Sequence, residues 1–175
     1  MEKLNKKRLI VTFILYCLLV MWIILLRMNI AQYCAKYRGV FLIPFSDNNF
    51  YSSEFTHYAC VIGNILLFIP LGIYFCLFLK EKKVYQRIFL GFIFVMLASL
   101  FLEITQYICV IGVTSTTDLF HNGLGGIIGI IIYELLKSFV SNETINAINK
   151  CTVIILIPVI MFAFIKTIVN FNLYI

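Results

Sequence analysis

The sequence predicts an all-α integral membrane protein, a bundle of about five transmembrane helices. Three observations predict this fold class: 62% of the 175 residues are apolar, only 13% are charged, and the apolar residues form long runs separated by short charged connections. Soluble domains carry about 25% charged residues. We therefore expect the lipid bilayer to surround a single transmembrane domain that takes in residues 1–175.

The lengths of the apolar runs predict where the spans lie. A helix needs about 20 mostly apolar residues to cross about 30 Å of hydrocarbon, and five runs come close to this, at about 9–26, 58–79, 88–111, 119–136 and 151–169. The first run follows a basic segment as a signal peptide would. Its 18 residues are too many for the usual apolar region of about 7–15 residues, and no small-residue cleavage site follows promptly. We expect an uncleaved first span.

Basic residues predict the orientation. If the N-terminus lies inside the cell, ten of the 14 Lys and Arg residues fall in cytoplasmic segments. Lys and Arg in short connections favour the cytoplasmic side. We expect the N-terminus inside and the C-terminus outside. The net charge of +6 is then a topology signal, and we expect no nucleic-acid partner.

Five polar side chains interrupt the apolar spans, namely Asn64, Glu103, Gln106, Asp118 and Asn122. A charged side chain at the centre of a span costs about 2.5–3.5 kcal/mol, and no basic residue stands near Glu103 in the sequence. At 1.5 Å per residue, Glu103 lies roughly 12 Å below the outer end of its span and Asn64 roughly 9 Å below the start of its own. We expect the five residues to form an outward-facing polar binding site.

A purely structural role is the alternative for these residues. Asn and Gln side chains in membrane helices often join neighbouring helices, at about 0.6 kcal/mol per contact. Asp118 opens the fourth run, where a carboxylate can cap free backbone N–H groups. The sequence leaves binding and structural roles open.

Small residues in the fourth run predict close helix packing. Asp118, Asn122, Gly125 and Gly129 fall at i, i+4, i+7 and i+11, on one helical face. The last two form a GxxxG pattern that lets another helix approach closely, and Gly126 adjoins them. We expect this stripe to pack against the face of the preceding helix that carries the glutamate and the glutamine.

Two further features concern the second span and the connection before it. Pro70 lacks an amide donor and predicts a kink beside Gly72. The connection 27–56 is the longest and has the apolar segment Phe41–Phe45 in its middle. A segment that dips into the interface and a loop folded over the helix ends explain this apolar segment equally well.

No residue set in the sequence indicates a metal site or a cofactor, and we expect neither. His57 and His121 lie near the rims of their spans and are not paired with each other, so we expect interfacial packing for both. The six cysteines contain no CxxC pair, so we expect buried or lipid-facing thiols, with a disulfide among Cys34, Cys60 and Cys109 as the alternative.

A family resemblance rests on several of these residues. The run Asn64–Gly72 resembles the N-x-L-L-F-x-P-x-G signature of the VanZ-like family. The block that begins with Glu103-x-x-Gln106 and continues through Asp118-x-x-x-Asn122 to the glycines matches that family's second block in order and approximate spacing, and Ile43–Phe45 is similar to its short Pro-Phe motif. The resemblance covers roughly residues 10–140.

The resemblance implies a phenotype rather than a reaction. The namesake of the family is associated with resistance to teicoplanin, a glycopeptide antibiotic with a fatty-acyl tail. The leading hypothesis is therefore a non-enzymatic protein that lowers susceptibility to such antibiotics, with a lipoglycopeptide or a lipid-linked wall precursor as partner. The alternative is an intramembrane enzyme or carrier for a lipid-linked envelope substrate, with Glu103 and Asp118 in proton transfer. The sequence contains no nucleophile–base pair or phosphate loop to favour an enzyme.

Overall fold

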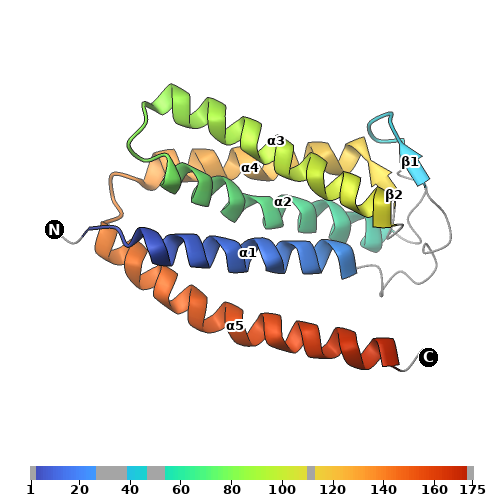
Figure 1. The fold of residues 1–175 in the computed structure, drawn as a ribbon. Helices are drawn as coiled ribbons and strands as arrows, with labels where there is room; N and C mark the ends of the chain where they lie inside the picture. The colour runs from blue at the N-terminus through green and yellow to red at the C-terminus, as the bar shows by residue number, and fades with distance from the viewer. Residues whose placement is uncertain (1–2, 27–38, 47–53, 110–112, 173–175) are drawn as a thin grey trace. The chain divides into compact units, whose positions relative to one another are not determined.

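The computed structural model describes residues 3–26, 39–46, 54–109 and 113–172, and within them the chain is almost entirely helical (Figure 1). The described elements are α1 (Lys6–Leu26), β1 (Gly39–Phe41), α2 (Glu54–Phe78), α3 (Val84–Cys109), β2 (Val113–Ser115), α4 (Thr116–Leu136) and α5 (Asn142–Asn172). Each of the five helices is long and apolar enough to cross a membrane. The all-α fold class, with five helices long and apolar enough to cross a membrane, is confirmed.

The helix boundaries differ from the predicted spans mainly at polar ends. The helix α5 begins at Asn142, well before the predicted residue 151. Its start is fixed by Ser141, whose Oγ accepts a hydrogen bond from the Thr144 amide at 3.1 Å. Ser141 thus caps the helix. Apolar runs in the sequence mark only the apolar part of a helix. Predicted spans therefore leave out polar first turns such as this one.

The described chain forms two compact units. The first unit contains α1 and α5, which are joined at their starts by asparagine side chains. The Asn146 side chain accepts a hydrogen bond from the Asn5 amide at 2.9 Å and donates one to the Lys3 carbonyl at 3.0 Å. Asn146 and Asn149 are both nearly fully buried. Backbone groups before α1 are therefore tied to the first turns of α5.

The second unit holds α2, α3, α4 and the two strands, and its core depends on close contact between α2 and α4. A Cβ atom added at Gly125 would overlap the Ile65 carbonyl oxygen, and one at Gly129 would overlap the Ile69 carbonyl oxygen. The two helix backbones therefore touch without intervening side chains, as GxxxG patterns allow.

The predicted helix partner was wrong for the two glycines of the stripe. Gly125 and Gly129 face α2, not the Glu103/Gln106 face of α3. The neighbouring Gly126 is the residue that faces α3, because an added Cβ there would overlap the Val95 side chain. Successive small residues therefore serve two sides of α4. Spacing on one helix identifies a face, and it does not identify which neighbour that face meets.

Pro70 lies inside α2, which remains a continuous helix from Glu54 to Phe78. On the same helix Gly72 approaches α4, since an added Cβ there would overlap the Gly126 carbonyl oxygen. The proline therefore sits in the stretch of α2 that packs most closely on α4. A kink at this proline stays a prediction.

A parallel pair of short strands ties the connection between α1 and α2 to the link between α3 and α4. Strand β1 pairs with β2 in the register Gly39↔Val113 to Phe41↔Ser115. In the described part of this connection, a loop folded over the start of α4 is therefore favoured over a segment that dips into the interface. Residues 27–38 and 47–53 lie outside the described residues.

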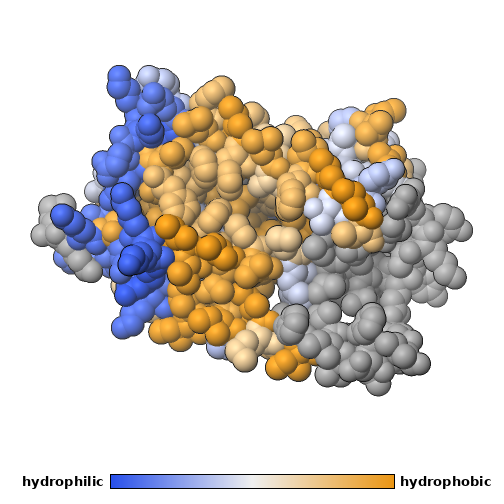
Figure 2. Space-filling model, in the orientation of Figure 1, coloured by the Kyte–Doolittle hydropathy of each residue, from blue (hydrophilic) through white to orange (hydrophobic). Residues whose placement is uncertain are grey.

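The sides of the second unit are apolar. Exposed residues along α3 include Phe92, Leu97, Phe101 and Ile108, each at least 41% exposed. Figure 2 shows this apolar side of α3, with hydrophilic residues gathered at the end of the unit that carries the α2–α3 turn. Such a surface fits a lipid environment.

Candidate functional site

Buried and half-buried polar side chains gather around the start of α4. They come from α2, α3, β2 and the first two turns of α4, and we call them the polar cluster: Asn64, Ser99, Glu103, Ser115, Asp118 and Asn122. The first of them, Asn64, is 6% exposed, and its Nδ2 donates a hydrogen bond to Asp118 Oδ1 at 2.5 Å. This bond joins α2 to α4 just above their glycine contact.

Glu103 reaches from α3 to the start of α4. Its carboxylate accepts a hydrogen bond from the Ser115 amide at 3.0 Å, and its backbone carbonyl accepts one from the Thr114 hydroxyl at 3.1 Å. The side chain is 5% exposed. Negative charge is stabilised at the N-terminal end of a helix, where the backbone N–H groups point outward. The start of α4 therefore compensates for part of the cost of burying this carboxylate.

The start of α4 has a serine cap. Ser115 Oγ accepts a hydrogen bond from the Thr117 amide at 3.1 Å, so Ser115 is the N-cap residue. Asp118 lies within the first turn, and its Oδ1 accepts from Asn64. In a capping box, an acidic side chain of the same helix accepts from the N-cap amide. Here the Ser115 amide donates to Glu103 of another helix, which leaves Asp118 to bond α2.

A third contact joins α3 to α4 deeper in the unit. Asn122 Nδ2 donates to Ser99 Oγ at 2.9 Å, and both residues are nearly fully buried. Within the described part of the chain, Asn122 Oδ1 has no hydrogen-bond partner. A buried acceptor without a partner costs roughly 1–3 kcal/mol. This amide oxygen is therefore the atom of the cluster best suited to accept a further hydrogen bond.

Gln106 does not join the cluster. Its Oε1 is buried and makes no hydrogen bond to the residues that the structure describes. Four of the five predicted site residues lie in the cluster, where Asn64 bonds Asp118 and the other two, Glu103 and Asn122, bond serines. The spacing of i, i+3 predicts that Gln106 shares a side of α3 with Glu103, but the hydrogen bonds from α3 to the start of α4 are made by Glu103 with Ser115 and by Ser99 with Asn122.

The apolar motif of the long connection covers the start of α4. The Phe45 amide donates to Thr117 Oγ1 at 2.8 Å, and the Thr116 hydroxyl donates to the Phe41 carbonyl at 3.2 Å. The Phe45 ring packs edge-on against Phe120, with 5.6 Å between ring centroids. Phe45 has a φ of 62°, a left-handed conformation that is uncommon for a bulky residue. The loop is held over the polar cluster by these contacts.

Sequence reasoning missed a buried ion pair at the other end of α3. The guanidinium of Arg87 bonds both carboxylate oxygens of Glu134, with 3.0 Å between Nη2 and Oε2. The Arg87 side chain is only 4% exposed. From the sequence, Arg87 was counted among the ten basic residues that indicate the cytoplasmic side. No role was assigned to Glu134, near the end of the fourth run. An acid in that position is a signal that calls for a partner.

The residues that the structure describes contain neither a disulfide nor a metal-binding group. Cys60 and Cys109 form no disulfide there, and Cys34 lies outside the described residues. The described His, Cys, Asp and Glu residues include no group of three placed to hold a metal ion.

Comparisons with known proteins connect this arrangement to a family. The profile of the VanZ/LLP1 family matches residues 13–137. The chain is similar to Protein VanZ of Enterococcus faecium, with 28% identity over 150 residues that cover 84% of this chain and 83% of that protein. No solved structure matches. The family match takes in α2, α3, α4 and every residue of the polar cluster, and the chain belongs to the VanZ/LLP1 family.

Proposed function

We propose that this chain lowers the susceptibility of a bacterial cell to lipid-tailed glycopeptide antibiotics such as teicoplanin, by binding and without catalysing a reaction. The polar cluster recognises the head of an amphipathic molecule at the outer face of the cytoplasmic membrane. That molecule is the antibiotic or a lipid-linked wall precursor. Membership of the VanZ/LLP1 family and similarity to a protein named VanZ support the proposal.

The observation that carries the proposal is the burial of polar groups at one end of three apolar helices. Glu103, Asn64 and Asn122 are each at most 6% exposed. Polar and ionisable groups within a membrane are costly and usually serve a function. The loop around Phe45 packs on Thr117 and Phe120, at the start of the helix that carries Asp118 and Asn122.

The arrangement favours binding over catalysis. The carboxylate of Glu103 accepts from a backbone amide, and that of Asp118 accepts from an asparagine side chain. In these two contacts the donors are amide N–H groups, whereas a general base works on a nucleophilic hydroxyl or thiol within hydrogen-bond reach. An intramembrane enzyme or carrier with Glu103 and Asp118 in proton transfer is the competing hypothesis.

Expression in a susceptible Gram-positive host tests the proposal. We expect a higher minimal inhibitory concentration of teicoplanin and little change for vancomycin, which lacks the acyl tail. Glu103→Gln keeps an acceptor for the Ser115 amide but removes the charge, and Asn64→Ala removes the bond to Asp118. Both changes should abolish the difference between the two drugs while the amount of protein in the membrane stays the same.

Thr105→Val is the matched control. Thr105 lies on α3 near Glu103, and among the described residues its hydroxyl bonds the Phe101 carbonyl of its own helix alone. This variant should keep wild-type resistance. If wild-type protein alters neither susceptibility, or alters both drugs equally, the role of the lipid tail is refuted. If the cluster variants lose activity only because they are degraded, the cluster is structural.

A further inference from the structure

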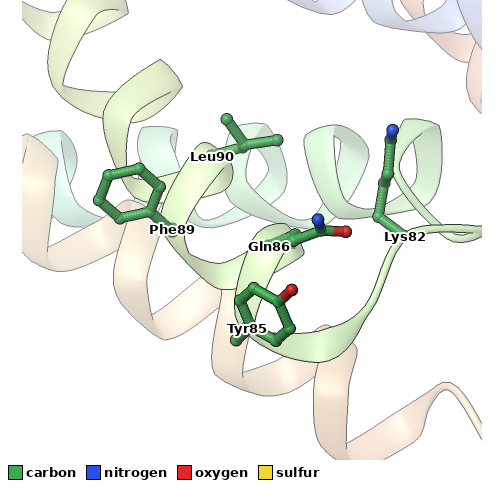
Figure 3. A pocket seen from close by; sticks show the side chains of 5 residues that line it. All are labelled: Lys82, Tyr85, Gln86, Phe89 and Leu90. Atoms are coloured by element: carbon green, nitrogen blue, oxygen red, sulfur yellow. The ribbon is translucent and has the colours of Figure 1, made fainter.

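A second feature lies at the end of α3 remote from the polar cluster. A surface hollow of about 240 Å³ is lined by side chains from the α2–α3 turn and the first two turns of α3 (Figure 3). Its lining residues are Lys82, Tyr85, Gln86, Phe89 and Leu90. They follow one another at helical spacing, so they share one face of the chain. The proposed antibiotic function uses none of them.

Three hydrogen-bond donors stand at this hollow. Lys82 provides an ammonium, Tyr85 a phenolic hydroxyl and Gln86 an amide N–H₂ group. The Gln86 side chain is oriented at the helix start, where its Oε1 accepts from the Lys83 amide at 3.4 Å. Because the amide oxygen is engaged there, the Nε2 group remains available as a donor. Three donors on one face suit an anionic ligand.

The charge of Lys82 is also available. In the described parts of the unit, Lys80 pairs with Glu81 at 3.8 Å and Arg87 pairs with Glu134, whereas Lys82 makes no ion pair. The backbone that carries Lys82 is held by Arg87, whose Nη1 donates to the Lys82 carbonyl at 2.8 Å and to the Lys80 carbonyl at 3.2 Å. The buried arginine thus fixes the turn, and its neutralised charge leaves Lys82 as the cation at the hollow.

The remaining lining is apolar and leads into the lipid-facing side of α3. Phe89 is 63% exposed and Leu90 39% exposed, and Phe92 continues the exposed apolar surface along the helix. Figure 2 shows hydrophilic residues at this end of the unit giving way to apolar residues along α3. A ligand here meets positive charge at one side and hydrocarbon-like surface at the other.

We propose that this hollow binds an anionic phospholipid, with its headgroup phosphate at Lys82 and Tyr85. The start of its acyl chains lies on Phe89 and Leu90. Basic residues at a membrane surface attract anionic lipids. The hydroxyl and amide groups at the hollow add directional hydrogen bonds, which non-specific electrostatic attraction lacks. The proposal is independent of the antibiotic function, because it concerns the opposite end of the second unit.

Native mass spectrometry of the full chain in an uncharged detergent tests this inference. With phosphatidylglycerol we expect one lipid retained per protein at concentrations where phosphatidylcholine is not retained. Lys82→Gln should lower phosphatidylglycerol occupancy about five-fold, the size of effect expected for one basic residue at an anionic surface. Tyr85→Phe should lower it further in the double variant.

Lys83→Gln is the matched control, since Lys83 is the adjacent exposed lysine and does not line the hollow. It should leave lipid occupancy unchanged. Equal losses from Lys82→Gln and Lys83→Gln, or equal retention of the two lipids, overturn the proposal. Competition by glycerol 1-phosphate as strong as by the lipid also overturns it, because the apolar side of the hollow then contributes nothing.

Discussion

At the scale of single residues, the start of α4 explains how an acid is accommodated among apolar helices. The Ser115 amide, which a residue of α4 itself would ordinarily satisfy, donates to Glu103 of α3 at 3.0 Å. Asp118 is thereby left to accept from Asn64 of α2. One helix start therefore organises acidic and amide side chains from two neighbouring helices.

Removal of the Glu103 side chain should destabilise the protein more than removal of its charge. Glu103→Ala leaves the buried Ser115 amide without its acceptor, at a cost of about 1–3 kcal/mol. Glu103→Gln keeps an acceptor oxygen in place. We expect the midpoint of thermal unfolding in detergent to fall in the order wild type, Gln variant, Ala variant. Equal midpoints for the two variants would show that the Ser115 bond adds nothing to stability.

The Arg87–Glu134 pair supplies a second prediction at this scale. Loss of one partner of a buried ion pair leaves an uncompensated charge and costs about 3–5 kcal/mol. Glu134→Leu should therefore lower the unfolding midpoint strongly, and Arg87→Leu should also release the turn carbonyls of Lys80 and Lys82. The double variant should be more stable than the sum of the two single losses predicts. If the stability losses of the two single variants add in the double variant, Arg87 and Glu134 do not stabilise each other directly.

At the scale of elements, α4 is the central helix of the second unit because small residues line two of its sides. Gly125 and Gly129 meet the backbone of α2, and Gly126 meets Val95 of α3. Between α2 and α3, Phe75 stacks on Phe94 with 4.1 Å between ring centroids. The three helices therefore combine one contact made through backbone with another made through large side chains.

The contact at Gly129 should tolerate no side chain. An alanine Cβ there overlaps the Ile69 carbonyl oxygen, which cannot move without shifting α2. At Gly91 an added Cβ meets the end of the Ile130 side chain at 3.0 Å, which can move aside. Gly129→Ala should cost about 1–3 kcal/mol, and Gly91→Ala should cost less. Comparable shifts in the unfolding midpoint of the two variants would contradict a backbone contact at Gly129.

These contacts mark what the sequence could and could not predict. The number of spans is a local property, since each apolar run of sufficient length predicts its own helix. Helix partners are not local. The i, i+4 pattern placed Asp118 and Asn122 on one face, yet they bond α2 and α3 respectively. Pairing also depends on distant residues such as Glu134, which lies far from Arg87 in the chain.

The same distinction applies to the candidate site. Asn64, Glu103, Asp118 and Asn122 were identified because polar groups in apolar runs are conspicuous. Ser99 and Ser115 were missed because a serine is unremarkable on its own, although Ser99 lies one helical turn before Glu103. A search one helical turn before Glu103, on the same face of α3, would have identified Ser99. Nothing local indicates that the Ser115 backbone amide meets a carboxylate from another helix.

At the scale of the whole molecule, the orientation in the membrane is open to direct test. Ten of the 14 basic residues favour a cytoplasmic N-terminus. A reporter inserted in the Lys80–Arg87 turn should report the cytoplasm, and one inserted after Ser46 should report the outside. The opposite pattern would place the polar cluster at the cytoplasmic face and refute binding at the outer one. A cytoplasmic C-terminus would exclude only the crossing by α5.

The parallel pairing of β1 with β2 also has a consequence for the order of assembly during synthesis. β1 leaves the ribosome before α2 and α3 are made, whereas its partner β2 comes after both of them. The Phe45 amide likewise can form its hydrogen bond to Thr117 only after the start of α4 has been synthesised. A nascent chain that has not yet reached Ser115 therefore has three helices, α1, α2 and α3, and the loop between the first two is still undocked. Closure over the polar cluster is a late event, completed only when α4 enters the membrane.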